Sequence, residues 1–305
     1  MKPFVGLLKR ELREHPALYV GPLGVNLLIA VSALMLVARA IGSVENLRNI
    51  VGVIDLADPA ALEVGRNALI ASPIAFVIGV TIVVGYFYFI DCLYAERKER
   101  TILFFKSFPV TDTQTVLSKL VCGVVILPAL SLVAFALTQI FVLIIVSVAM
   151  FFAGGSPGAL WSLGGIVSNW LFIFYVLLSC ALWYAPFIGF LLLVSAWAKR
   201  AVFLWSIMPF IAMHAEWLIP GPNVLTPLVV NHFIGYPVAA FAVSEILGTN
   251  DESAFMTWLQ DRPLNALMFA DPGGFVREPA LWVGLMIAAL FVIGAIFLRR
   301  YRDDS

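Results

Sequence analysis

His214, Glu216 and His232 come closest in this chain to a catalytic or metal-binding set of residues. His214 and Glu216 stand two positions apart, so on one helix their side chains point about 200° away from each other. The HExxH pattern of metallopeptidases and the GxSxG pattern of serine hydrolases are both absent. We therefore expect no catalytic or metal site here. Glu216 is expected to hydrogen-bond into the segment that follows it.

The sequence also lacks cysteine motifs for disulfides or metals and a motif for binding phosphate. Cys92, Cys122 and Cys180 lie far apart in apolar surroundings without a CxxC pair, which indicates buried small side chains. No GxxxxGK[ST] pattern occurs, so the chain has no P-loop of its own with which to bind ATP. We expect it to bind no cofactor and to catalyse no reaction by itself.

The most informative stretch is the polar loop over 91–119. Its first part is a dense mixed-charge cluster in which Glu96 and Arg100 have the spacing of an ion pair on a helix. An apolar run that includes three phenylalanines follows, and Pro109 ends it. Thr111 and Gln114 have the spacing of a capping box, which predicts the start of a new helix. Three phenylalanine side chains would be unfavourable in water, so we expect lipid headgroups, neighbouring spans or a partner subunit to shield them from solvent.

The stretch ERKERTILFFKSFPVTDTQTVLSK, residues 96–119, resembles the inner loop of type-2 ABC exporter permeases, whose membrane subunits have six spans. In that family the loop is a coupling helix that docks on a separate ATP-binding subunit. The resemblance implies a permease subunit of an ATP-driven exporter, with ATP and Mg²⁺ bound by the partner. The implied contact residues are Glu96, Arg97, Lys98, Arg100, Thr101, Phe104, Phe105, Lys106, Phe108, Pro109 and Asp112.

The overall composition indicates what kind of protein holds this loop in position. Hydrophobic residues make up 62% of the 305 residues and charged residues only 12%, with a mean hydropathy of +0.98. Soluble domains carry about a quarter charged residues, so this chain is predicted to be a polytopic membrane protein. The formal net charge is zero, which gives no field that would attract nucleic acid.

Charge-free runs long enough to cross about 30 Å of hydrocarbon predict six transmembrane helices in an all-α fold. The spans are expected near 17–38, 68–91, 120–151, 167–197, 201–219 and 280–298. No charged residue lies between Lys119 and Lys199, and the cluster Gly154–Gly158 predicts a hairpin inside that run. The amphipathic segment 1–16 is expected to form an interfacial helix, with 92–119 as the coupling loop.

The distribution of basic residues sets the expected orientation. With both termini in the cytoplasm, fourteen of the nineteen lysines and arginines fall on the inside. The segment 220–279 is then an outer region, and its proline-rich start is expected to re-enter the membrane rather than cross it. Together with the resemblance, this predicts a multi-pass protein of a bacterial inner (cytoplasmic) membrane.

Two other functional classes stay open beside an ATP-driven exporter. An ion-driven secondary transporter usually shows inverted repeats and a charged residue at mid-membrane, and neither is visible here. A non-catalytic membrane assembly subunit is the second alternative. The expected partners are a P-loop ATPase subunit, membrane lipid and a second copy of the chain, since closed two-fold assembly is the commonest. The apolar spans favour a hydrophobic or amphipathic cargo.

Overall fold

A computed structural model describes residues 2–41, 73–98, 110–218, 225–241 and 266–301 of the chain. These residues are 90% helical and contain no strand, which confirms the expected all-α fold. The helices are α1 (Lys2–Glu14), α2 (Ala17–Ile41), α5 (Ile74–Asp91), α6 (Tyr94–Lys98), α8 (Asp112–Val121), a π-helical turn (Cys122–Ile126), α9 (Leu127–Ala153), α10 (Leu163–Trp183), α11 (Ala185–Trp197), α12 (Val202–Ser206), α13 (Met208–Leu218), α14 (Leu225–Ala240), α17 (Pro272–Arg277) and α18 (Pro279–Tyr301), with 3₁₀ turns at Pro157–Leu160 and Ala266–Phe269.

Five segments of the described chain are helical, long and apolar enough to cross a membrane, and they indicate a multi-pass membrane protein. They are Ala17–Arg39, Ile74–Lys98, Asp112–Phe152, Leu163–Trp183 and Pro279–Tyr301. Their outer surfaces are apolar as well. Leu28, Phe151 and Leu290 are each about two-thirds exposed or more (66%, 71% and 68%), as side chains that face lipid should be.

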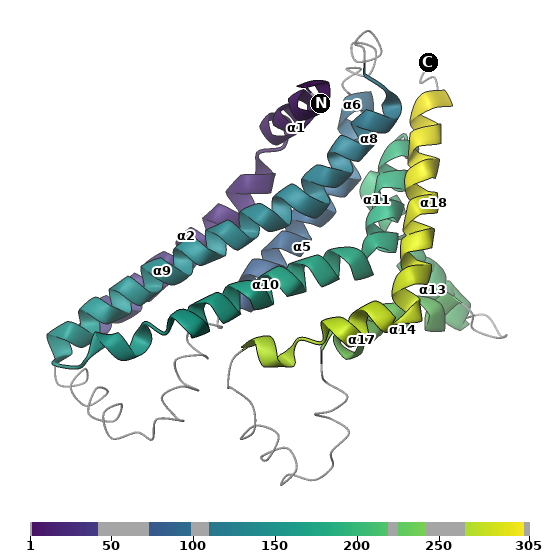
Figure 1. Cartoon of the computed structure of the whole chain (residues 1–305). Coiled ribbons are helices and arrows are strands. Elements are labelled where there is room, and N and C mark those ends of the chain that lie inside the picture. Colours follow the sequence, from purple (N-terminus) through teal and green to yellow (C-terminus); the bar gives the residue numbers. More distant parts are fainter. Residues whose placement is uncertain (1, 42–72, 99–109, 219–224, 242–265, 302–305) are drawn as a thin grey trace, which may run out of the picture.

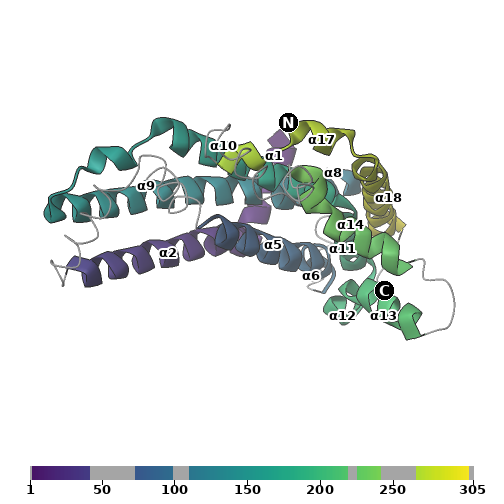
Figure 2. The same cartoon turned by 90° about the horizontal axis from the view of Figure 1, so that it is seen from below.

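The helices gather at one end of the molecule and spread apart towards the other (Figure 1). α1, α6, the start of α8 and the end of α18 lie together at the top of the view. From there α2 and α9 run side by side in one direction, while α11 and α18 form a second pair (Figures 1 and 2). α13, α14 and α17 lie around the far end of this second pair. Segments distant in sequence therefore meet at the converging end.

Three local expectations are confirmed. The N-terminal segment is helical, and Leu8 and Leu12 pack on the main hydrophobic core. The capping box forms: the Gln114 N–H donates to the Thr111 hydroxyl and the Thr111 N–H donates to the Gln114 side chain, both at 3.2 Å. The hairpin after α9 also forms, because Gly154 ends that helix in the left-handed region with φ of 87°.

Two of the expected spans are interrupted. The segment 167–197 is divided at Tyr184 into α10 and α11, and 201–219 is divided at Ile207 into α12 and α13. Pro186 and Pro209 follow these breaks, and a proline ring can neither donate to the preceding turn nor fit against it. The segment 201–219 is not among the five helices of spanning length, so a sixth span there is not confirmed.

Other boundaries differ from expectation or lie outside the described residues. The third span begins earlier than 120, because α8 starts at Asp112 and continues through the π-helical turn into α9. Of the proline-rich segment expected to re-enter the membrane, α14 is a regular helix that packs on α13, α10 and α17. Residues 68–72, 220–224 and 242–265 of the predicted second span and outer segment lie outside the described residues.

α11 and α18 approach each other closely through small residues. A Cβ atom placed on Gly189 would lie 2.9 Å from the backbone oxygen of Ala288 and 3.3 Å from its Cα. Because both obstructing atoms belong to the backbone of α18, no side-chain rotation can make room. Small residues at such crossings let membrane helices pack directly on one another. The two helices are therefore in direct backbone contact at this crossing.

Replacing Gly189 with leucine is expected to lower the free energy of unfolding by about 1–3 kcal/mol, because α18 must shift away from α11. The matched control is Gly79→Leu on α5, where an added Cβ meets nothing within 4 Å. Thermal unfolding of both variants in the same detergent measures the difference. Equal melting temperatures for the two variants would contradict the close packing.

Candidate functional site

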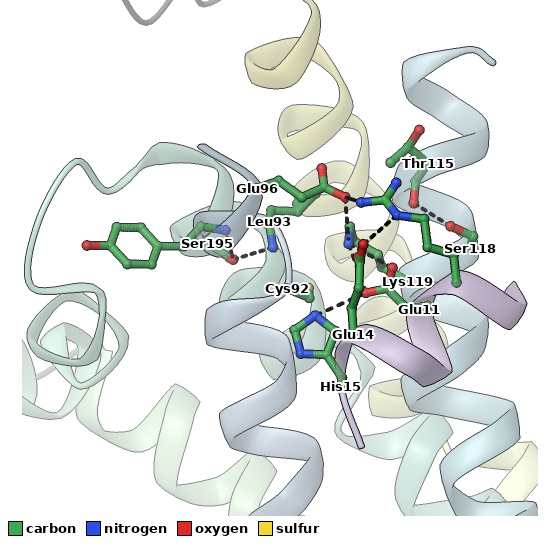
Figure 3. Close-up of polar contacts among 12 residues, drawn as sticks. Glu11, Glu14, His15, Cys92, Leu93, Glu96, Thr115, Ser118, Lys119 and Ser195 are labelled. Atoms are coloured by element: carbon green, nitrogen blue, oxygen red, sulfur yellow. Dashed lines mark hydrogen bonds and ion pairs between the residues drawn. The ribbon is translucent and has the colours of Figure 1, made fainter. Parts of the chain in front are cut away.

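A fully buried lysine stands at the end of the molecule where the helices converge. Lys119 on α8 is 0% exposed, and its Nζ lies 2.8 and 2.9 Å from the two carboxylate oxygens of Glu11 on α1. The same Nζ lies 2.9 Å from Oε1 of Glu96 on α6. Taking a charge out of water costs several kcal/mol unless it is paired, and here one ammonium group serves two buried carboxylates. Figure 3 shows Lys119 beside both Glu11 and Glu96.

The C-terminal helix contributes a second buried cation to the same place. Arg299 of α18, 7% exposed, donates through Nη1 to Oε2 of Glu96 and through Nε to Asp112 at 3.1 Å. Nη2 of Arg10 on α1 lies 3.7 Å from Glu96. Arg10 also pairs with Glu14, at 2.6 Å. We call this set the ionic junction; its members are Arg10, Glu11, Glu96, Asp112, Lys119 and Arg299.

A tyrosine hydroxyl and an imidazole also contact Glu11 within the junction. The hydroxyl of Tyr88 on α5 lies 3.2 Å from a Glu11 oxygen and 3.1 Å from the backbone oxygen of Lys119, and can donate to either. The imidazole of His15 packs edge-on against the Tyr88 ring, with its Nε2 3.4 Å from Glu11. These contacts connect the carboxylate to α5 as well as to α8. The junction therefore links α1, α6, α8 and α18, and Tyr88 connects it to α5.

Ser195 and Arg97 attach the short helix α6 to the end of α11. The Ser195 hydroxyl accepts hydrogen bonds from the N–H groups of Leu93 and Tyr94, at 3.1 and 3.0 Å. Arg97 donates to the backbone oxygen of Ser195 and, at 2.9 Å, to that of Ala198. N–H groups at a helix start and carbonyls at a helix end lack partners within their own helix, and these contacts supply them. The start of the predicted coupling loop is thus bonded to α11.

The structure describes four of the predicted contact residues. Glu96 is 5% exposed and faces the junction, and the pair with Arg100 that its spacing predicted stays untested because Arg100 lies outside the described residues. Arg97 is half-buried against α11, Lys98 is exposed, and Asp112 is half-buried beside Arg299. Outside the described residues lie Arg100, Thr101, Phe104, Phe105, Lys106, Phe108 and Pro109.

Several members of the junction were not expected from the sequence. Glu11, Lys119 and Arg299 stand near the ends of apolar segments, where a charge usually marks the membrane boundary. Glu11 and Lys119 are 108 positions apart in sequence, and Glu96 and Arg299 are 203 apart. No local pattern joins positions at these separations. The one available signal was the recurrence of charges at several helix ends expected on the same side.

The residues that came closest to enzyme chemistry have structural contacts. Glu216 hydrogen-bonds into the segment that follows it, as expected: it accepts from the N–H groups of Leu225 and Thr226, at 2.8 and 2.7 Å, and so caps the start of α14. His232 lies on the face of Trp183, with Nε2 2.9 Å from the Trp183 backbone oxygen. His214 stacks on Trp217. Among the residues that the structure describes, no group of three or more His, Cys, Asp or Glu side chains could hold a metal ion.

A cavity of about 930 Å³ lies between α11, α13, α14 and α18, away from the junction. Its walls are mostly aromatic and aliphatic, and Glu278, just before α18, is one of its few polar lining residues. We call it the aromatic cavity. Prominent among its lining residues are Phe187, Phe190, Phe210, Phe233 and Phe291. Its size is in the range of pockets that bind drug-sized molecules.

Comparisons with protein-family models, curated proteins and solved structures found no match for this chain. What the chain does must therefore be inferred from the ionic junction and the aromatic cavity.

Proposed function

We propose that this chain is the membrane-spanning subunit of an ATP-driven exporter, powered by a separate P-loop ATPase that docks on the loop between α6 and α8. The observation that carries the proposal is the attachment of that loop at both of its ends. Glu96 on α6, which precedes the loop, and Asp112 at the start of α8, which follows it, both pair with Arg299. A protein that pulls on the loop therefore pulls on α18 through a buried ion pair.

The contacts of the loop lead on to the aromatic cavity. α6 is bonded to the end of α11 through Ser195 and Arg97, and α11 packs tightly along α18. The cavity lies further along these same two helices, and both contribute to its walls. A displacement at the ionic junction can thus change the cavity by rigid movement of the α11–α18 pair. This is the coupling that an exporter needs between its energy source and its cargo site.

The placement of charge argues against an ion-driven secondary transporter. Among the described residues, the buried charged side chains are Glu11, Glu96, Lys119 and Arg299, and all belong to the ionic junction. Ion-driven transporters place such groups near mid-membrane, where the ion binds.

In this proposal the chain lies in a bacterial inner membrane, with the ionic junction and both termini on the cytoplasmic side. It pairs with a second copy to complete the pathway.

The proposal predicts an inactive isolated chain and a copurifying ATPase. The tagged chain, purified gently from its native membrane, is expected to bring down a P-loop ATPase subunit identifiable by mass spectrometry. The chain alone, expressed in a different host, is expected to hydrolyse no ATP because its sequence has no P-loop. ATP turnover in a preparation that lacks any ATPase subunit would contradict the proposal, and so would native preparations without such a partner.

A further inference from the structure

We propose that the aromatic cavity is a binding site for an amphipathic organic cation, with Glu278 as the group that selects positive charge. The cavity as such does not depend on the proposed export. Only its role as the cargo site rests on that function.

Charge complementarity is the first argument. Glu278 is the one residue with a full formal charge among the described residues that line the cavity, and no lysine or arginine is among them. Within the described part of the chain, the Glu278 carboxylate has no hydrogen bond or ion pair. The start of α18 opposes this charge with only about half a unit of positive charge. The described part of the cavity lining therefore carries a net negative charge.

The walls supply the second argument. Phe187 and Phe233 meet edge to face, as do Phe190 and Phe291, so that aromatic rings from three helices surround the space. Aromatic faces attract organic cations through their quadrupole, and they bury apolar substituents equally well. An anion would gain nothing from these faces and would meet the carboxylate. A fully apolar ligand would gain nothing from the half-buried carboxylate.

His232 and Trp183, which also line the cavity, do not alter this balance. The Nε2–H of His232 donates to the backbone oxygen of Trp183, which can only accept, and the Trp183 indole N–H donates back to the His232 oxygen at 2.7 Å. This reciprocal pair holds α14 against the end of α10. His232 is thereby fixed as part of the cavity wall, which leaves Glu278 to determine the preferred charge of the ligand.

The test compares two probes of nearly equal size and shape but opposite charge, tetraphenylphosphonium and tetraphenylborate. Binding to the purified full chain in a neutral detergent is measured by titration calorimetry, for wild type, Glu278→Gln and Asp91→Asn. The phosphonium is expected to bind the wild type and to bind Glu278→Gln about tenfold more weakly. Asp91, an exposed carboxylate at the end of α5, removes the same charge elsewhere when it is replaced and is expected to have no effect.

A second variant tests whether the probe enters the cavity. Val283→Trp places a bulky ring on α18 in the cavity wall and is expected to abolish phosphonium binding. Borate binding that equals or exceeds phosphonium binding, with no response to Glu278→Gln, would overturn the charge selection. Phosphonium binding that survives Val283→Trp would overturn the location. These measurements use no ATPase, so they succeed or fail separately from the proposed export.

Discussion

Replacing Lys119 with methionine is expected to lower the free energy of unfolding by about 3–5 kcal/mol, because it leaves two buried carboxylates without their shared cation. Methionine matches the length of lysine but removes the charge. Glu11 and Glu96, 3% and 5% exposed, would then lose the ammonium group that both of them contact. Thermal unfolding in detergent should show a fall of roughly 10 °C in Tm.

The matched control is Lys199→Met, which removes the same charge from an exposed position just after α11. Its effect is expected to stay within about 0.5 kcal/mol. The double variant Glu11→Gln/Lys119→Met is expected to lose less stability than the two single losses combined, because the two side chains form one ion pair. Additive losses, or a Tm unchanged by Lys119→Met, would contradict a buried junction.

Truncating the phenylalanines of the predicted coupling loop is expected to have the largest functional effect. If the loop docks in an ATPase groove, Phe105→Ala and Phe108→Ala each remove an aromatic anchor from a desolvated contact. Such truncations cost about 2 kcal/mol or more, which is roughly a thirtyfold loss of affinity. The variants should fold normally, since neither residue belongs to the ionic junction. They should lose ATPase association and transport-linked hydrolysis.

Pull-down of the ATPase with the tagged chain measures this effect. Leu247→Ala, in the segment predicted to lie outside, serves as the control and should retain association at the wild-type level. If the double variant Phe105→Ala/Phe108→Ala still binds its ATPase at wild-type strength, the loop is not the docking element. Its phenylalanines would then anchor the loop in lipid.

Local features of the fold were predictable because short-range interactions determine them. The capping box needs only Thr111 and Gln114, and the end of α9 needs a glycine free to adopt positive φ at position 154. The breaks at Tyr184 and Ile207 were missed as ends of spans, although Pro186 and Pro209 are visible in the sequence. A proline inside an apolar run predicts a kink or a break equally well, and packing decides between the two.

The sequence predicted where in the chain the candidate site lies, but not the contacts that form it. The charges of residues 96–119 indicated where a partner could dock, and the absence of a P-loop assigned ATP binding to another chain. That Glu96 faces inward was not predictable. A charged residue in a loop normally keeps its charge in water, and only partners from other helices make burial favourable.

The sequence by itself determined that the chain is helical, membrane-spanning and without catalytic or metal-binding motifs. Composition, charge-free length and local capping are properties of neighbouring residues, so they can be read without knowing the fold. The tertiary structure alone decided that Lys119 neutralises Glu11 and Glu96, that Arg299 joins both ends of the loop, and that α11, α13, α14 and α18 enclose a cavity beside Glu278. These contacts join positions up to 203 residues apart, and such pairs meet only when whole helices pack side by side.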